Sequence, residues 1–308
     1  MAQRAGAIVW EGCRASGICR ESAQQVSVQT SNGEIFARYL IGADGANGVI
    51  ARHLNSRSSY FWQTALYCEV PGDSVRHDSI RPSTMRIDWG SLPSGYGWIF
   101  PKGGGVNIGV GCPSVIARVL RPYLRRFIER EGILKPNTFD KLQFRGHPLP
   151  TLTPATRLSS DKVILVGDAA GLVEPLTGEG ISNACQSAEI ASQFIMDNLN
   201  RSGNEEPYDR RIRTEIGCEI TWARQLLCLA VAFPKTVFRR FRTDDRVWEA
   251  FCHVLGGEAS FLSLRQAVLG RLDMLSAPLH RFSEWQEKYR LLRGGRPVPE
   301  GKIAKYSA

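Results

Sequence analysis

The stretch that decides the fold is VILVGDAAGLVEPLTGEGI, residues 163–181. Its first four residues are aliphatic, which is typical of a short buried strand. The strand pattern stops at Gly167-Asp168, and a helical pattern begins at Ile181. A strand, a tight glycine-rich loop and the amino-terminal end of a helix bring a carboxylate and unpaired amides together. This order of elements favours a site for a polyol and its phosphates.

The helix expected after this loop is amphipathic. Its apolar residues recur at the spacing of one helical face, and they are Ile181, Ala184, Cys185, Ala188, Ala191, Ile195 and Leu199. We expect this face to be buried. A simpler alternative is an ordinary strand-to-helix turn in which Asp168 only caps the loop. The run PLTGEG at 175–180 favours the ligand site, because a cap does not require those residues in one connection.

A second glycine-rich turn follows a short apolar run in YLIGADGANG, residues 39–48. It carries one carboxylate, Asp44. This residue could face a ligand, or it could be the N-cap or Asx-turn residue of a following helix. The residues of this turn leave both interpretations open.

The third informative stretch is YGWIFPKGGGVNIGVG, residues 96–111. Aromatic rings occupy alternate positions, which places them on one face of a strand: Tyr96, Trp98 and Phe100. Residues 106–111 alternate in the same way, and 102–105 predict a hairpin loop between the two strands. An aromatic strand face is usually plain core. Gly109 and Gly111 instead favour the wall of a long apolar slot, because they remove side-chain bulk opposite the rings.

The three stretches resemble the geranylgeranyl reductase family of FAD-dependent oxidoreductases. GDAAG with PLTGEGI is similar to the second flavin motif of FAD-dependent reductases and hydroxylases, IGADGAN to their other flavin motif, and 96–111 to the aromatic signature associated with substrate binding. The flavin contacts implied by this resemblance are Gly42, Asp44, Gly45, Gly167, Asp168, Gly171, Gly178, Gly180 and Ile181. The implied substrate contacts are Tyr96, Trp98, Phe100, Pro101, Gly109 and Gly111.

The resemblance also implies roles for single residues. Asp168 would hold a ribityl hydroxyl, and the amides of Gly180 and Ile181 would lie near the flavin ring. Asp44 would lie on the phosphate or ribityl side of FAD. No catalytic residue is assigned, and Glu179 is as well explained by a structural role at the helix start as by proton donation.

The chain departs from the family pattern in the second motif and near residue 1. Gly48 stands where a serine is usual, and Ala51 where the first basic residue is usual, with Arg52 following. A strand followed by GxGxxG and a helix, the usual dinucleotide-phosphate motif, is not found in residues 1–308. We expect the adenosine-binding βαβ unit to be missing, through an incomplete reading frame, a late start or a split gene. FAD binding should then be weakened.

We expect a mixed α/β (α+β) fold with a partial FAD-binding domain of the glutathione-reductase or hydroxylase type, an antiparallel-sheet substrate domain and a helical C-terminal region. The expected segments are 1–56 (FAD-binding), 57–150 (substrate domain), 151–200 (return to the FAD-binding domain), 201–293 (helical region) and 294–308 (loose tail). Expected strands in the first segment are 7–9, 25–30 and 34–41, with a turn at 31–33, and a helix is expected at 114–131.

Composition excludes several classes. The chain has 308 residues, 43% of them hydrophobic, which is enough for a substantial core. Its 8 cysteines and 5 histidines show no metal-ligand spacing, so we expect no metal and reduced thiols in a cytoplasmic protein. The longest apolar run, 226–233, is too short to span a membrane, although peripheral membrane contact would suit a lipid substrate.

The net charge of +9 is compatible with nucleic acid, an anionic membrane surface or a polyanionic ligand. The basic residues fall in dispersed groups, and no nucleic-acid-binding module accompanies them, so most should be solvated helix faces. If one group is functional, we expect it to contact a diphosphate head group or lipid phosphates.

The activity implied by the resemblance is reduction of isolated C=C bonds of a prenyl (geranylgeranyl-type) lipid or prenyl diphosphate by hydride from FAD. NADPH and ferredoxin both remain open as electron donors. One alternative is a flavin-dependent monooxygenase or halogenase, which shares the two flavin motifs. The other is a non-catalytic prenyl-binding remnant.

Overall fold

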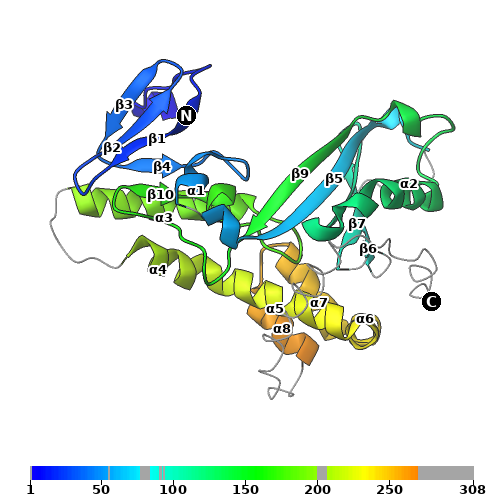
Figure 1. Ribbon diagram of the computed structural model, residues 1–308. Coiled ribbons are helices and arrows are strands. Elements are labelled where there is room, and N and C mark those ends of the chain that lie inside the picture. Colours follow the sequence, from blue (N-terminus) through cyan, green and yellow to red (C-terminus); the bar gives the residue numbers. More distant parts are fainter. Residues whose placement is uncertain are drawn as a thin grey trace. The chain divides into compact units, whose positions relative to one another are not determined.

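The computed structural model describes residues 2–54, 56–76, 84–89, 92, 94–199 and 207–269. The chain divides into two compact units (Figure 1), the first within 1–61, 152–173 and 179–218, and the second within 62–151, 174–178 and 219–308. The run 163–181 is therefore shared between the units. The expected tail at 294–308 and the part of the helical region beyond 269 lie outside the described residues.

The first unit contains two small sheets. β1 (Ala15–Glu21), β2 (Val26–Thr30) and β3 (Gly33–Ala37) form an antiparallel sheet in that order. The predicted turn at 31–33 joins β2 to β3, and Gly33 takes a φ of 111° there. β4 (Leu40–Gly42) and β10 (Val163–Leu165) form a parallel pair in which Gly42 lies beside Leu165.

The helices of the first unit are mostly short. They are η1 (Ala2–Ala5), α1 (Ile50–His53), η2 (Ser56–Ser59), η6 (Gly167–Ala170), α3 (Ile181–Leu199), α4 (Tyr208–Ile212) and the π-helix η7 (Arg213–Gly217). The predicted helix after the glycine-rich loop is thus confirmed as α3.

Two strand predictions in this unit were wrong. Residues 7–9 are not a strand, and Ile8 is 85% exposed, so no sheet in the described part of the chain covers this apolar run. The expected strand at 34–41 is two strands, β3 and β4, which belong to different sheets and are separated by Arg38 and Tyr39. An alternating pattern cannot reveal such a change of partner.

The buried face of α3 also differs from the prediction. Its buried residues are Ser187, Ile190 and Ala191, whereas Ile181 is 81% exposed. Ser187 turns inward because its hydroxyl accepts a hydrogen bond of 3.0 Å from the Gly167 amide. The buried face thus shares Ala191 with the predicted face but is turned around the helix axis toward Ser187 and Ile190.

The second unit is built on a five-stranded sheet with the order β6-β7-β8-β5-β9. Its strands are β5 (Phe61–Pro71), β6 (Arg86–Trp89), β7 (Tyr96–Lys102), β8 (Gly105–Pro113) and β9 (Phe144–Thr151). β7 pairs antiparallel with β6 and β8, and β8 pairs antiparallel with β5. The predicted hairpin loop is confirmed between β7 and β8, where Gly104 has a φ of 80°.

One face of this sheet is covered by α2 (Leu120–Glu131), which follows the 3-10 helix η4 (Ser114–Val119) (Figure 1). The helix expected at 114–131 is therefore present, and its first part, 114–119, is a 3-10 helix. Leu124 and Phe127 pack with Ile99 and Ile108 in the core. Phe127 lies so close to Gly97 that a Cβ on that glycine would meet its ring at 3.0 Å. Two short 3-10 turns, η3 (Gly72–Ser74) and η5 (Phe139–Lys141), complete this part.

The remaining helices are α5 (Cys218–Ala232), α6 (Pro234–Thr243), α7 (Asp245–Leu255) and α8 (Phe261–Leu269). The helical series predicted from 208 onward is buried as expected: Tyr208, Ile212, Ile216, Ile220, Ala223 and Leu227. Among the described residues, no single helix has the length and apolarity to cross a membrane. Residues 208–232 and 234–243 satisfy that test only as a pair bent by 107°.

Candidate functional site

The two glycine-rich turns leave the same edge of the parallel β4-β10 pair. Besides the strand register, the Val166 amide donates a 3.1 Å hydrogen bond to the Gly42 carbonyl. The loop with Asp44 follows β4, and the loop with Asp168 follows β10. In open α/β sheets, ligands bind beyond the carboxyl ends of parallel strands. The fold therefore places both predicted carboxylates at the edge where such a ligand would lie.

Asp168 lies against the start of α3. A Cβ on Gly180 would stand 3.2 Å from Asp168 Oδ1, so the carboxylate needs the glycine beside it. In the described part of the chain, the amides of Gly180 and Ile181 donate to no protein acceptor. The carboxylate can accept a hydrogen bond from a hydroxyl, and the two available N–H groups can donate to ring acceptors of the same ligand.

Glu179 supports the beginning of α3. Its carboxylate accepts hydrogen bonds of 2.8 Å from both the amide and the hydroxyl of Ser182. This is the geometry of a cap on a helix end, where a negative charge is also favoured by the helix dipole. The sequence left two roles open for Glu179, a structural role at the helix start and proton donation. Its contacts are those of the structural role.

Asp44 caps α1 in the structure. Its Oδ2 accepts hydrogen bonds from the Val49 amide (2.6 Å) and the Ile50 amide (3.2 Å). A Cβ on Gly48 would stand 2.1 Å from Asp44 Oδ1, so the missing serine side chain leaves the space in which this carboxylate lies. The departure from the family pattern at Gly48 is therefore coupled to the position of Asp44. Of the two interpretations left open, the contacts describe the cap.

The other predicted flavin glycines of the first unit divide into two kinds. A Cβ would collide with Leu165 and Ile50 at Gly42, and with the Tyr60 ring at Gly171, so these glycines are required by packing within the unit. Gly167 and Gly45 have φ values of 55° and 73°. Gly45 faces open space, since a Cβ there would meet nothing within 4 Å.

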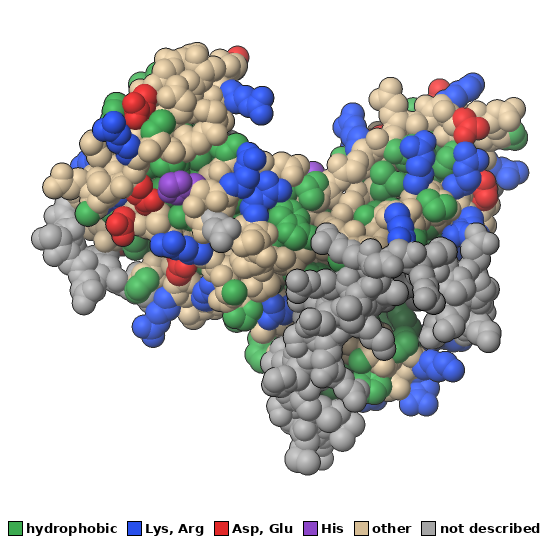
Figure 2. Space-filling model, in the orientation of Figure 1, with side chains coloured by type: hydrophobic (Ala, Val, Ile, Leu, Met, Phe, Trp, Pro, Cys, Tyr) green, Lys and Arg blue, Asp and Glu red, His purple; other side chains and the backbone are tan. Residues whose placement is uncertain are grey.

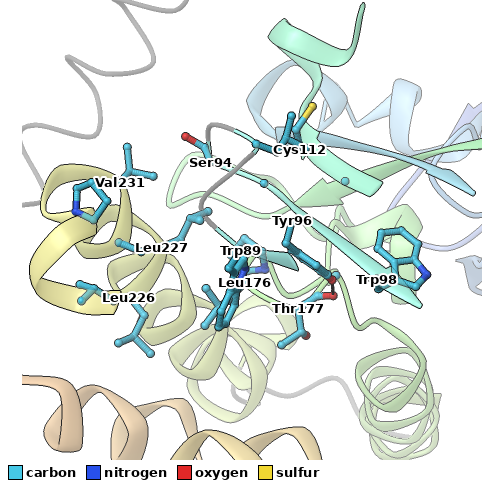
Figure 3. A pocket seen from close by; sticks show the side chains of 18 of the residues that line it. Trp89, Ser94, Tyr96, Trp98, Cys112, Leu176, Thr177, Leu226, Leu227 and Val231 are labelled. Atoms are coloured by element: carbon cyan, nitrogen blue, oxygen red, sulfur yellow. Dashed lines mark hydrogen bonds between the residues drawn. The ribbon is translucent and has the colours of Figure 1, made fainter. Parts of the chain in front are cut away.

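The second unit contains a pocket of about 1610 Å³. Its walls come from the sheet face opposite α2, from Pro175–Gly178 and from α5, α6 and α8. Among the described residues that line it, none is an aspartate or glutamate. Figure 3 shows Tyr96 directed toward Thr177, with Leu226, Leu227 and Val231 contributed by α5. A space of this size and composition suits a long apolar ligand.

A series of rings forms the sheet wall of the pocket. The ring centroids are 6.2 Å apart from Trp89 to Tyr96, 5.7 Å from Tyr96 to Trp98, and 6.1 Å from Trp98 to Phe100. The alternation predicted for Tyr96, Trp98 and Phe100 is confirmed, and all three line the pocket. Trp89, which extends the series, was not predicted. Pro101 does not line the pocket.

The rings line a pocket, as expected, but Gly109 does not open it. Trp98 pairs with Gly109, and a Cβ on Gly109 would stand only 2.2 Å from the indole Cζ2. At Gly111 the nearest indole atom would be 3.7 Å away. The Trp98 indole fills the space above the glycine pair, where its Nε1 donates a 2.6 Å hydrogen bond to Asn107. Gly111 lines the pocket and Gly109 does not.

The loop Glu174–Gly178 is held by a buried carboxylate. Glu174 is 3% exposed and accepts hydrogen bonds from the Leu176 amide, the Thr177 amide (2.9 Å) and the Thr177 hydroxyl (2.5 Å). The Tyr96 hydroxyl donates to the Thr177 carbonyl. Burial, and then the charge of Glu174, raise the pKa of Tyr96, so this phenol stays protonated.

The structure places one predicted flavin residue in the second unit. Gly178 lines the pocket, whereas Gly180 and Ile181 belong to the first unit. Two residues that hold this loop were not predicted from the sequence, Gln63 and Glu174. The Nε2 of Gln63 donates to the Pro175 carbonyl at 3.0 Å. The spacing from Glu174 to Thr177 is that of a side-chain turn, which was the available signal.

No family model matches the chain. The fold is similar to that of a geranylgeranyl bacteriochlorophyll reductase-like protein from Thermoplasma acidophilum, with a TM-score of 0.64 and 24% identity, covering 94% of this chain and 72% of that one. It is also similar to the flavin-dependent brominase Bmp2, with a TM-score of 0.57 and 14% identity, covering 94% and 73%. The fold is that of the flavin-dependent oxidoreductases.

Sequence similarity narrows this class. The chain is 34% identical over 194 residues to digeranylgeranylglycerophospholipid reductase 2 of Methanothermobacter thermautotrophicus, which covers 60% of this chain and 48% of that protein. The chain belongs to the geranylgeranyl reductase family of FAD-dependent oxidoreductases, as its motifs predicted. It spans about half the length of the curated relatives that it matches.

Proposed function

We propose that the protein reduces isolated C=C bonds of a prenyl, geranylgeranyl-type lipid, using FAD. The observation that carries this proposal is the pocket of about 1610 Å³ in the second unit, with its series of aromatic rings and, in the described part of the chain, no acidic lining residue. The aromatic wall of such a pocket favours a long unsaturated hydrocarbon, because burying apolar surface is favourable.

The first unit would supply the ribityl and ring side of the FAD site. Asp168 would accept a hydrogen bond from a ribityl hydroxyl, and the amides of Gly180 and Ile181 would donate to acceptors on the ring. The glycine at 180 fits this role, because a side chain there would press on the Asp168 carboxylate. Asp44 would lie on the phosphate or ribityl side. When bound, FAD supplies the hydride for alkene reduction.

The contribution of the pocket is to hold the alkene in one orientation and to exclude water. The Tyr96 hydroxyl is engaged with the Thr177 carbonyl, so this ring would position the chain as an apolar surface. Glu179 is used in capping α3. We therefore assign neither of them as the proton donor, and we leave both NADPH and ferredoxin as electron donors.

We expect residues 1–308 to bind FAD weakly, since they lack the glycine-rich phosphate-binding motif. Flavin absorbance of the purified chain, alone and titrated with FAD, measures this directly. Stoichiometric FAD carried through purification would contradict the expectation of weak binding and leave the assignment of Asp168 intact.

Product analysis tests the activity. The protein is incubated anaerobically with FAD, dithionite and geranylgeranyl diphosphate, and the product is analysed by mass spectrometry. The proposal predicts a gain of two hydrogen atoms for each reduced bond. Unchanged substrate under these conditions, together with incorporation of oxygen in air, would instead support the flavin-dependent monooxygenase alternative.

A further inference from the structure

Helix α6 carries two different faces side by side. Pro234, Val237 and Phe241 form an apolar stripe, and Lys235, Arg239 and Arg242 recur at the i, i+4, i+7 spacing of a neighbouring stripe. All six residues line the pocket of the second unit. The helix therefore presents hydrocarbon and positive charge to the same space.

The apolar stripe fixes the helix beside the aromatic wall. The centroid of Phe241 lies 5.7 Å from that of Trp89, in an edge-on contact, and Phe241 also contacts Phe251 at 5.4 Å. Trp89 is in turn the first ring of the series that continues to Tyr96 and Trp98. A chain lying along these rings would have one end next to the cations of α6.

The three cations have no acidic partner in the part of the chain that the structure describes. Among the described residues, Lys235, Arg239 and Arg242 form no ion pair, and no acidic residue lines the pocket. Some basic residues elsewhere are paired: Arg125 Nη2 lies 2.8 Å from Asp140, and Arg130 Nη2 lies 2.9 Å from Asp88. Figure 2 shows Lys and Arg side chains spread over the visible face, several of them over α2. The described Lys and Arg residues that line the pocket are therefore all on α6.

We propose that Lys235, Arg239 and Arg242 form a head-group subsite that binds the phosphate or diphosphate of a prenyl amphiphile. Guanidinium and ammonium groups donate charge-assisted hydrogen bonds to phosphate oxygens, and three of them match a group that carries more than one negative charge. This inference rests on the proposed prenyl-lipid function. It adds that the anionic head group binds at the α6 end of the pocket.

The same helix provides a matched control. Arg240 follows Arg239 directly, does not line the pocket, and its Nη1 lies 3.1 Å from Asp244. Successive helical residues are turned by about 100°, so Arg240 lies on a different side of α6 from all three subsite residues. Arg240→Gln removes one positive charge from the same helix and leaves the subsite complete.

Binding is measured by quenching of tryptophan fluorescence, because Trp89 and Trp98 line the pocket and no flavin is needed. The probes are geranylgeranyl diphosphate, geranylgeraniol and inorganic diphosphate, applied to the full chain. The diphosphate should bind at least about tenfold more tightly than the alcohol, and Arg239→Gln or Arg242→Gln should each weaken it by about tenfold. Neither variant should change the affinity for geranylgeraniol, and Arg240→Gln should change the affinity for the diphosphate by less than about twofold.

Equal affinity of the wild-type chain for the alcohol and the diphosphate would overturn the subsite while leaving a prenyl-binding pocket. The same conclusion would follow if Arg240→Gln weakened diphosphate binding as much as Arg239→Gln. Failure of both prenyl ligands to bind would overturn the pocket assignment itself, and the subsite with it. Inorganic diphosphate should compete only weakly, because it lacks the chain that the rings hold. Thermal unfolding of each variant verifies that the fold is kept.

A second experiment distinguishes binding of a substrate head group from binding to a membrane surface. Flotation with phosphatidylglycerol vesicles, and with phosphatidylcholine vesicles as the neutral reference, is compared for the wild-type chain and the α6 variants. If the variants lost vesicle binding but kept their affinity for geranylgeranyl diphosphate, the cations would contact a bilayer and the head-group subsite would be wrong. Loss of geranylgeranyl diphosphate affinity in solution supports the subsite.

Discussion

The indole of Trp98 lies directly over Gly109 of the neighbouring strand, where a Cβ would come within 2.2 Å of it. The pair is aligned by the β7-β8 register, and the indole nitrogen is held by Asn107. A ring fixed in this way gives the pocket a rigid wall. Residue 109 must therefore be a glycine for the Trp98 ring to take this position. Trp98 is one of the rings that were predicted to face the substrate.

Gly109→Ala should displace this wall. The added methyl group cannot coexist with the Trp98 ring, and overpacking of this kind costs about 1–3 kcal/mol of unfolding free energy. Urea unfolding, together with the near-ultraviolet circular dichroism of the tryptophans, measures both effects. Gly111→Ala is the matched control, because its nearest indole atom would be at an ordinary contact distance of 3.7 Å. Equal destabilisation by the two variants would contradict the assigned contact.

The strand pattern predicted this site only in part. Alternation correctly placed Tyr96, Trp98 and Phe100 on one face, because side-chain direction in a strand follows directly from the backbone. It did not show that the Trp98 ring turns across to its partner strand and fills the gap above Gly109. That outcome depends on a rotamer and on a hydrogen bond to Asn107, which a sequence pattern does not contain.

Asp168→Ala should weaken FAD binding without unfolding the chain. The carboxylate is half-buried beside Gly180, and loss of a hydrogen bond from a ligand hydroxyl to a charged group costs about 1.5–3 kcal/mol, which is about 10- to 100-fold in affinity. Titration of FAD fluorescence provides the affinities. Asp161→Ala removes an exposed carboxylate just before the same strand, β10, and should have no effect. Unchanged FAD affinity in the Asp168 variant would count against the flavin site.

Glu174→Gln should loosen the loop that lines the pocket. Three donors from Leu176 and Thr177 converge on the buried carboxylate, and a glutamine amide would turn an N–H group toward one of them. We expect a loss of about 2 kcal/mol in unfolding free energy, together with weaker binding of geranylgeraniol. Thr177→Val removes only the hydroxyl and should cost less. Calorimetry and fluorescence titration measure the two effects, and a Gln variant as stable as the wild type would show that the carboxylate is not needed.

The helices illustrate where sequence reasoning succeeds and where it stops. The series from Tyr208 to Leu227 was predicted correctly because nearly all buried positions of this stretch are hydrophobic, and Arg224 is its one charged buried residue. In α3 the inward position of Ser187 depends on a hydrogen bond to Gly167, so the apolar spacing indicated the buried face only in part: Ala191 is buried but Ile181 is exposed. The cations of α6 were visible as a basic group, but only the fold shows that Arg239 and Arg242 line a pocket and Arg240 does not.

The stability of the first unit should depend on pH through Glu21, the last residue of β1. Its Oε1 accepts hydrogen bonds from the Ser160 hydroxyl (2.5 Å) and the Lys162 amide (3.0 Å), and its Oε2 lies 3.2 Å from His53 Nε2. Burial alone would raise the pKa of Glu21, but these hydrogen bonds together outweigh it and lower the pKa below its usual value.

A carboxyl group with a lowered pKa in the folded state stabilises the fold above its unfolded pKa, which is near 4.5. That contribution is lost as the pH falls through the folded value, because the folded state must then bind the proton that the unfolded state already holds. We expect Glu21→Gln to cost about 1–2 kcal/mol of unfolding free energy at pH 7, and less at pH values below about 4. Urea unfolding across this range measures the difference. The exposed Glu34 on β3 provides the control, since Glu34→Gln should leave the pH profile unchanged. If the difference between wild type and Glu21→Gln stayed constant from pH 7 to pH 3, the hydrogen bonds to Ser160 and Lys162 would not depend on the charge of Glu21.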